Sequence, residues 1–88
     1  MNNDRRKRIA AILERVAAFD NMRQELFDEI DEIAGEESDY FDNMPESLQS
    51  GDKGTRAEEA RDSLYEARDF FDNLDLSEVT SPLESAAE

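Results

Sequence analysis

The apolar residues in the first half of this chain recur every seven residues, and this periodicity restricts the fold more than any other feature. One row holds Ile9, Val16 and Ile30 and is broken at Arg23; a second holds Ile12, Phe19, Leu26 and Ile33; Leu13, Phe27 and Ala34 form a third. Apolar rows three or four residues apart are typical of helices that pack as in coiled coils. We expect a first helix over about residues 4–43, capped by Asn3 or Asp4.

A turn and a second helix follow. Pro45 disfavours helical backbone at Met44, so we expect a turn over residues 45–54. Thr55 and Glu58 have the spacing of a capping box, which predicts a second helix over about residues 56–75. Its apolar period comprises Ala57, Ala60, Leu64, Ala67, Phe71 and Leu74. The sequence therefore predicts an all-α fold, an antiparallel two-helix hairpin with coiled-coil-like packing.

The expected hairpin occupies residues 1–76, and residues 77–88 are predicted to be a flexible tail because they lack a period and contain Pro82. The second helix is the shorter one. It leaves the first helix without an intrachain partner at Ile9, Ile12, Leu13 and Val16. An exposed apolar stripe of this size is unusual in a monomer. Either Val79 and Leu83 of the tail cover it, or a second copy does; we favour a homodimer that forms a helical bundle.

Charge is strongly asymmetric along the chain. Acidic residues number 24 and basic residues 10, for a net charge of −14, yet residues 1–16 carry about +3 and the remainder about −17. A negative body repels nucleic acids and anionic lipids. It is suited instead to a protein surface that binds phosphates, so the expected partner is a basic nucleic-acid-binding protein of a host cell.

Acidic residues step by mostly three or four positions along both expected helices. The candidate partner-binding residues are Glu25, Asp28, Asp31, Glu32, Glu36, Asp39, Asp42, Glu58, Glu59, Asp62, Glu66, Asp69 and Asp72. Each step advances about 4.5–6 Å, against ~3.4 Å per phosphate of a DNA strand. Two such stripes side by side could satisfy a phosphate-binding groove. The alternative is a solvated face that serves solubility only.

The basic residues raise separate questions. Arg5, Arg6, Lys7 and Arg8 oppose the helix dipole at its N-terminus, so another interaction is expected to compensate. Either a neighbouring copy's acidic body or a nucleic-acid backbone would serve, and direct nucleic-acid binding is unlikely except through these four residues. Arg23 either pairs with Asp20 or sets the register of a dimer seam. Arg61 and Arg68 are expected to pair with carboxylates of the first helix.

The sequence offers little for catalysis or for cofactors. There is no His, Cys or Trp, and no Gly-rich phosphate loop or nucleophile elbow. The acid clusters at residues 28–32 and 36–39 do not follow the EF-hand pattern. No apolar run approaches the ~20 residues that span a bilayer. We expect a cytoplasmic, non-enzymatic protein without a metal or cofactor.

The stretch from Tyr40 to Ser50, with the helix that follows, resembles small acidic helical proteins of phages and mobile elements. In these an aromatic–DNMPESLQ turn joins two acidic helices, and no activity is assigned to the family. In that setting small acidic proteins are similar to DNA mimics, including anti-CRISPR proteins and inhibitors of DNA-binding enzymes. The expected function is therefore a phage-type DNA-mimic inhibitor. The alternatives are an oligomerisation protein and a small accessory protein that contacts nucleic acid through its basic N-terminus.

Overall fold

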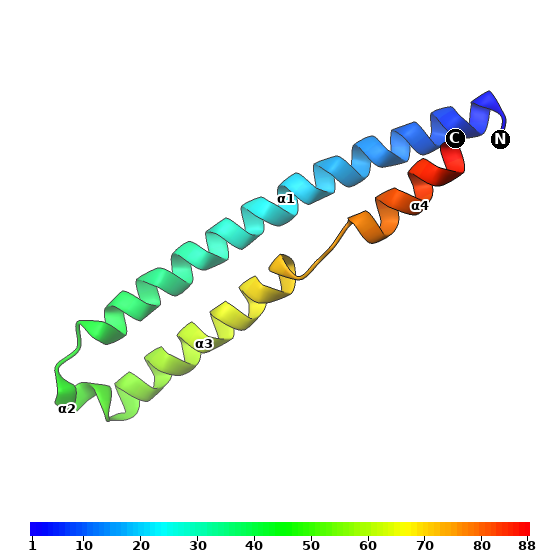
Figure 1. Cartoon of the computed structure of the whole chain (residues 1–88). Coiled ribbons are helices and arrows are strands. Elements are labelled where there is room, and N and C mark those ends of the chain that lie inside the picture. The colour runs from blue at the N-terminus through cyan, green and yellow to red at the C-terminus, as the bar shows by residue number, and fades with distance from the viewer.

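The computed structural model describes all 88 residues, and every regular element in it is a helix. The elements are α1 (Asn3–Asp42), α2 (Glu46–Gln49), α3 (Asp52–Asp72) and α4 (Ser77–Ala87). Figure 1 shows α1 as one rod along the whole molecule, with α3 and α4 running back beside it and α2 at the turn. The prediction of an all-α chain is confirmed.

The molecule is elongated and has almost no core. Its extents are 69 × 15 × 13 Å and its radius of gyration is 20.5 Å, whereas a compact domain of this length has a radius of about 12 Å. Only Ala34, Gly54 and Ala57 are buried. Most side chains at the helix contacts are therefore only half-buried.

The contact line on α1, here called the α1 seam, follows a strict alternation of three and four residues. It comprises Arg6, Ile9, Leu13, Val16, Asp20, Arg23, Phe27, Ile30, Ala34, Glu37 and Phe41, and the spacing continues to Met44 just beyond the helix. The matching line on α3 comprises Gly54, Ala57, Arg61, Leu64, Arg68 and Phe71, and on α4 it comprises Thr80, Leu83 and Ala87. The heptad pattern therefore places α1 against α3 and α4 along its whole length.

The row assignment from sequence was only partly right: Ile9, Val16 and Ile30 of α1 and Ala57, Leu64 and Phe71 of α3 lie on the seams, but other positions differ. On α1 the third row faces α3, while the second row, Ile12, Phe19, Leu26 and Ile33, remains exposed. On α3 the seam uses Arg61 and Arg68 in place of Ala60 and Ala67. Both guanidinium groups stack on aromatic rings, Arg61 on Phe41 at 5.7 Å and Arg68 on Tyr65 at 4.5 Å. Their apolar stems and ring contacts suit a half-buried seam better than alanine does.

At the C-terminal end of each of the three longer helices, a backbone carbonyl accepts a hydrogen bond from a side chain of another element. The Nε2 of Gln49 donates to the Phe41 carbonyl of α1 at 3.0 Å. On α1 itself, Arg23 Nη1 donates to the Phe71 carbonyl of α3 at 2.9 Å. These contacts satisfy carbonyls that a helix end leaves without an intrahelical donor. They matter here because no helix has a basic residue in its last turn and no glycine has a positive φ.

The third such contact involves the basic N-terminus. Arg6 Nε donates to the carbonyl of Ala87 at 3.1 Å, and its Nη2 donates to that of Glu88 at 3.4 Å, at the end of α4. Asn2, rather than Asn3 or Asp4, caps α1, because its side-chain oxygen accepts from the Arg5 backbone N–H at 2.8 Å. Arg6 therefore holds the two ends of the chain together.

The predicted flexible tail is instead helix α4, which packs on α1. Asp75 accepts from the Ser77 hydroxyl at 2.6 Å and from the Ser77 backbone N–H at 3.0 Å, and so starts the helix. Pro82 lies inside α4 and lacks a backbone N–H, but the helix continues past it to Ala87. The apolar face of Leu83 and Ala87 against α1 compensates for that loss.

The covering of the N-terminal stripe also differs from the favoured prediction. Ile9, Leu13 and Val16 are half-buried on the α1 seam, alongside α4, so they are not free for a dimer seam; Ile12 alone of the four is exposed.

The predicted turn of residues 45–54 contains α2 and the start of α3. Thr55 is not a cap but lies within α3, where its hydroxyl donates to the Gly51 carbonyl at 3.1 Å. The buried Gly54 permits this early start, because a Cβ there would overlap the backbone of Gln49.

Candidate functional site

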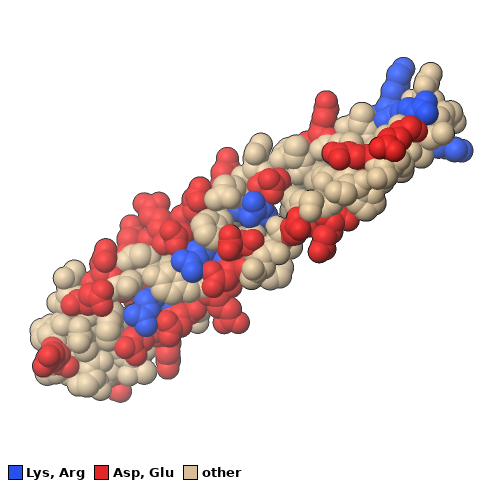
Figure 2. Space-filling view, viewed as in Figure 1, with Lys and Arg blue, Asp and Glu red and all other residues tan.

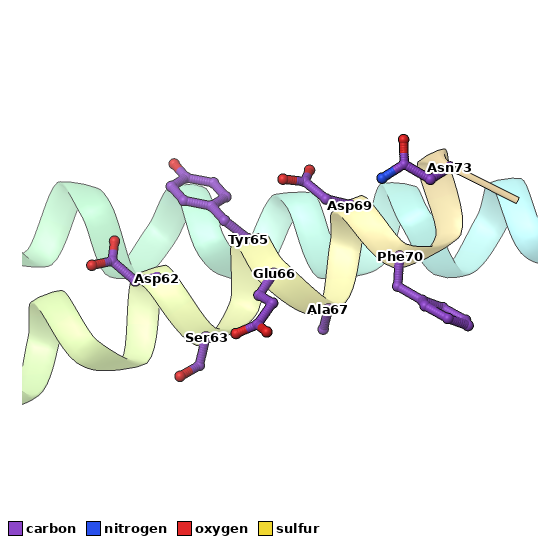
Figure 3. A pocket seen from close by; sticks show the side chains of 8 residues that line it. All are labelled: Asp62, Ser63, Tyr65, Glu66, Ala67, Asp69, Phe70 and Asn73. Carbon is purple, nitrogen blue, oxygen red and sulfur yellow. The ribbon is translucent and has the colours of Figure 1, made fainter.

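The helices lie side by side in one layer, which has two broad faces. Arg68 binds Asp31, which directly follows a seam position on α1, and stacks on Tyr65, which directly follows a seam position on α3. The residues that directly follow seam positions therefore share one face. A hollow of about 360 Å³ is lined by Ile12, Phe19 and Val79 among others, so the residues that directly precede seam positions share the opposite side. Figure 3 shows the division on α3, where Tyr65 and Asp69 point to one side and Ala67 and Phe70 to the other.

The acidic face is the side that bears Asp31 and Tyr65, together with the outer ridges of both helices. All thirteen candidate partner-binding carboxylates are exposed. The six on α3 lie on this face or its ridge, and so do those on α1 apart from Glu36. Glu36 follows Ile33 by three residues and lies on the opposite side. The structure thus brings the two predicted stripes together along one side of the molecule.

Three of the thirteen carboxylates are neutralised by seam arginines. Asp31 and Asp69 both lie 2.8 Å from Arg68, and Asp62 lies 3.1 Å from Arg61. The ten others make no ion pair. Figure 2 shows this pattern as acidic side chains along both long edges, with a broken line of basic ones between them. The unpaired carboxylates are therefore the groups available to an outside cation.

Arg68 is the main electrostatic link between α1 and α3. Its side chain is one-quarter exposed and bridges a carboxylate of each helix. The hydrogen bonds that its guanidinium donates to Asp31 and then to Asp69 raise the pKa of that guanidinium. The prediction that Arg68 pairs with the first helix is confirmed, whereas Arg61 pairs with Asp62 of its own helix. Arg23 does pair with Asp20, at 2.8 Å.

The apolar face is the side opposite. It exposes Ile12, Phe19, Met22, Leu26, Ile33 and Tyr40 of α1, Phe70 of α3 and Val79 of α4. Phe19, Met22 and Phe70 retain 54%, 58% and 63% of their surface exposed. The small Ala60 and Ala67 lie on the α3 part of this face. The sequence identified the row of Ile12, Phe19, Leu26 and Ile33, of which it assigned Ile12 to a dimer seam, but it did not identify Met22 as part of an exposed face.

The basic N-terminal residues do not form one patch. Arg6 is occupied by the end of α4. Arg5 and Arg8, three residues apart, share a side with Ile12, with which both line a hollow. Lys7 lies on another side of the helix, because a step of one or two residues rotates the side chain away. This dispersal weakens the alternative in which these four residues contact a nucleic-acid backbone.

The site carries no arrangement typical of catalysis or metal binding. No group of three or more potential ligand side chains converges. The largest hollow, about 810 Å³, is lined by residues of α3 and its C-cap Asn73, which Figure 3 shows distributed around one helix and not enclosing a space. No helix has the combination of length and apolar character needed to cross a bilayer.

Comparisons with known proteins found no family model, curated protein or solved structure that matches this chain. The resemblance to acidic proteins of mobile elements stays a prediction. Function must therefore be inferred from the two faces themselves.

Several structurally important residues were not identified from the sequence. The stretch Asp75-Leu76-Ser77-Glu78 has the spacing of a capping box, and this signal could have located α4. The sequence singled out Arg6 and Arg23, seventeen residues apart on the α1 seam, but it gave no signal that their side chains donate to the ends of α4 and α3. Their roles depend on where α3 and α4 end, which only the folded chain shows.

Proposed function

We propose that the protein is an acidic DNA mimic that binds the basic nucleic-acid-binding surface of another protein and inhibits it. The proposed scaffold is a helical hairpin in which α1 and α3 hold their carboxylates in fixed rows. The observation that carries the proposal is the acidic face, with nine exposed carboxylates that no arginine neutralises. A face built only for solubility would not need to hold like charges at such close spacing.

The spacing of these charges suits a surface made for DNA. Successive carboxylates on one helix are about 4.5–6 Å apart along the axis, and two adjacent helices lie about 8–10 Å apart. On α1 the candidate carboxylates run from Glu25 to Asp42, about 26 Å at 1.5 Å per residue, which corresponds to about seven or eight steps of duplex DNA at ~3.4 Å each. A groove that tracks a phosphate backbone would thus meet carboxylates along that part of the molecule.

Opposite charge would govern both the rate and the salt dependence of binding. A net charge of −14 attracts a cationic partner over distances of about a Debye length, ~8–10 Å at physiological ionic strength. Association would be fast at low salt and slower as salt rises. In a phage or mobile-element setting such a partner would be a host defence enzyme, as for anti-CRISPR proteins.

The direct test is capture of partners from a bacterial lysate, followed by competition with duplex DNA. We expect nucleic-acid-binding proteins to be recovered and then displaced by added DNA and by rising salt. The test variant is Glu58→Gln, Glu59→Gln and Glu66→Gln, which removes three unpaired charges from the acidic face. The control is Glu78→Gln, Glu84→Gln and Glu88→Gln, which removes the same charge from α4 and its C-cap residue, beside the N-terminal half of α1.

Loss of capture in the first variant and retention in the second would support the acidic face as the binding surface. Equal capture by both variants would show that net charge, and not this face, governs binding. Recovery of no nucleic-acid-binding protein, or of proteins that DNA does not displace, would contradict the proposal. The chain would then be better explained as an oligomerisation protein with a solvated acidic face, the alternative that the exposed apolar face favours.

A further inference from the structure

The apolar face requires a cover that the chain itself does not provide. Eight large hydrophobic side chains are exposed on it, while no large side chain is fully buried in the monomer. The accessible surface is 6595 Å², compared with about 5,300 Å² expected for a compact chain of 10.1 kDa. A small helical chain with so little core needs oligomerisation or another staple, and it has no cysteine for a disulfide.

The residues along the α1 part of this face are arranged symmetrically about a centre. Apolar residues correspond to apolar residues across this centre, and basic residues correspond to acidic ones. The row at its edge comprises Arg8, Arg15, Met22, Glu29 and Glu36. Its neighbouring row comprises Ile12, Phe19, Leu26 and Ile33. Both rows are centred at Met22 or just after it. A second α1 laid antiparallel across this centre would place Arg15 beside Glu29, Arg8 beside Glu36 and Phe19 beside Leu26.

The remaining exposed aromatic residue fits the same arrangement. Phe70 lies beside Phe71, whose carbonyl Arg23 contacts, so it sits just to one side of Met22 along the molecule. The hollow lined by Ile12, Phe19, Leu76 and Val79 lies at a similar distance on the other side. A twofold rotation about Met22 therefore brings Phe70 of each copy over the hollow of the other.

We propose that two copies associate through their apolar faces as an antiparallel, twofold-symmetric dimer whose axis passes next to Met22. Such a contact is self-complementary, as an isologous interface must be. It pairs basic with acidic residues at the edge and buries the apolar rows between them. Both acidic faces point outward, which keeps the net negative charges of the two copies apart. This inference does not depend on the partner proposed above.

The position of the axis can be tested with single cysteines, because the chain has none of its own. Met22→Cys lies at the proposed axis and should form disulfide-linked dimers under mild oxidation. Ile33→Cys lies about 31 Å from its counterpart in the proposed dimer, at 1.5 Å per residue, and should not. A parallel dimer would cross-link at both positions and would overturn the proposal. Absence of cross-linking at Met22→Cys would overturn it as well.

A charge exchange tests the register without depending on the cysteine variants. Arg15→Glu places like charges at both symmetric edge contacts and should weaken the dimer at least tenfold, as measured by sedimentation equilibrium. Adding Glu29→Arg to the same chain restores opposite charges and should restore the dimer. Failure of the double variant to recover would contradict this register. A wild-type chain that sediments as a monomer up to 100 µM or so would contradict the dimer itself, and it would leave the proposal for the acidic face standing.

Discussion

The guanidinium of Arg23 on α1 donates to the carbonyl oxygen of Phe71 at the end of α3, at 2.9 Å. The same side chain pairs with Asp20 and is only 15% exposed. Arg23 is thus the residue that interrupts the apolar period of α1 and also the residue that closes α3. One charged side chain on the seam fixes where the shorter helix ends and where α4 can begin.

Replacing Arg23 with methionine should destabilise the fold. The methionine keeps an unbranched stem in the seam, but it leaves Asp20 without its donor and leaves the Phe71 carbonyl only the Leu74 backbone N–H at 3.4 Å. A hydrogen bond from a charged group contributes about 1.5–3 kcal/mol, so the free energy of unfolding should fall by about that amount. Urea denaturation followed by circular dichroism measures it. An unchanged denaturation midpoint would show that Arg23 is dispensable for the end of α3.

Two glycine substitutions should act in opposite directions. A Cβ at Gly35 meets no atom within 4 Å, so Gly35→Ala should stabilise α1 by about 0.5–1 kcal/mol through helix propensity. A Cβ at Gly54 would overlap the backbone of Gln49, so Gly54→Ala should force α2 away from α3 and destabilise the chain by about 1–3 kcal/mol. Thermal unfolding of both variants compares them directly. If Gly54→Ala were as stable as Gly35→Ala, the close packing of α2 on α3 would be wrong.

The start of α4 should depend on pH. Donation from the Ser77 hydroxyl, and then from its backbone N–H, lowers the pKa of Asp75. Because the folded-state pKa lies below the unfolded one, this contact stabilises α4 at neutral pH, and that contribution is lost as the pH falls below about 4. Carboxyl resonances followed by nuclear magnetic resonance would report it. In Ser77→Ala the pKa of Asp75 should rise; an identical titration in both chains would contradict the contact.

Salt should stabilise the folded chain while it weakens the proposed binding. The acidic face holds many like charges close together, and their repulsion is screened as the Debye length falls from about 10 Å at 0.1 M salt to about 3 Å at 1 M. The melting temperature should rise by a few degrees over that range. A melting temperature that falls with potassium chloride would indicate that ion pairs such as Arg68–Asp31 outweigh the repulsion.

The sequence predicted the helices better than their contacts. Helical periodicity and Pro45 placed the first helix over residues 4–43, and α1 spans Asn3–Asp42. The three apolar rows of α1 exceed what one seam can bury, and the sequence alone does not show which rows face inward. The choice depends on Arg61 and Arg68, which stack on aromatic rings and displace the alanines from the seam. Apolar periodicity does not predict these seam positions, because arginine is treated as a polar residue when the period is read.

For the candidate site, too, the sequence predicted the positions of residues better than their contacts. Spacing alone located the thirteen carboxylates, and all are exposed. Which of them remain unpaired could not be predicted, because the ion pair of Arg68 with Asp31 requires the register of α1 against α3. Glu36 was assigned to the acidic stripe because spacing alone does not show on which side of α1 a residue lies. Only the position of the seam shows that Glu36 lies on the side opposite the acidic face.

The apolar face is proposed to bind a second copy of this chain, and the acidic face a basic partner. Alkylation of two single-cysteine variants, Leu26→Cys on the apolar face and Glu59→Cys on the acidic face, distinguishes the two interactions. Raising the protein concentration should protect Cys at position 26 only, and adding the captured nucleic-acid-binding protein should protect position 59 only. Protection of position 59 by self-association, or of position 26 by the partner alone, would contradict this assignment of the two faces.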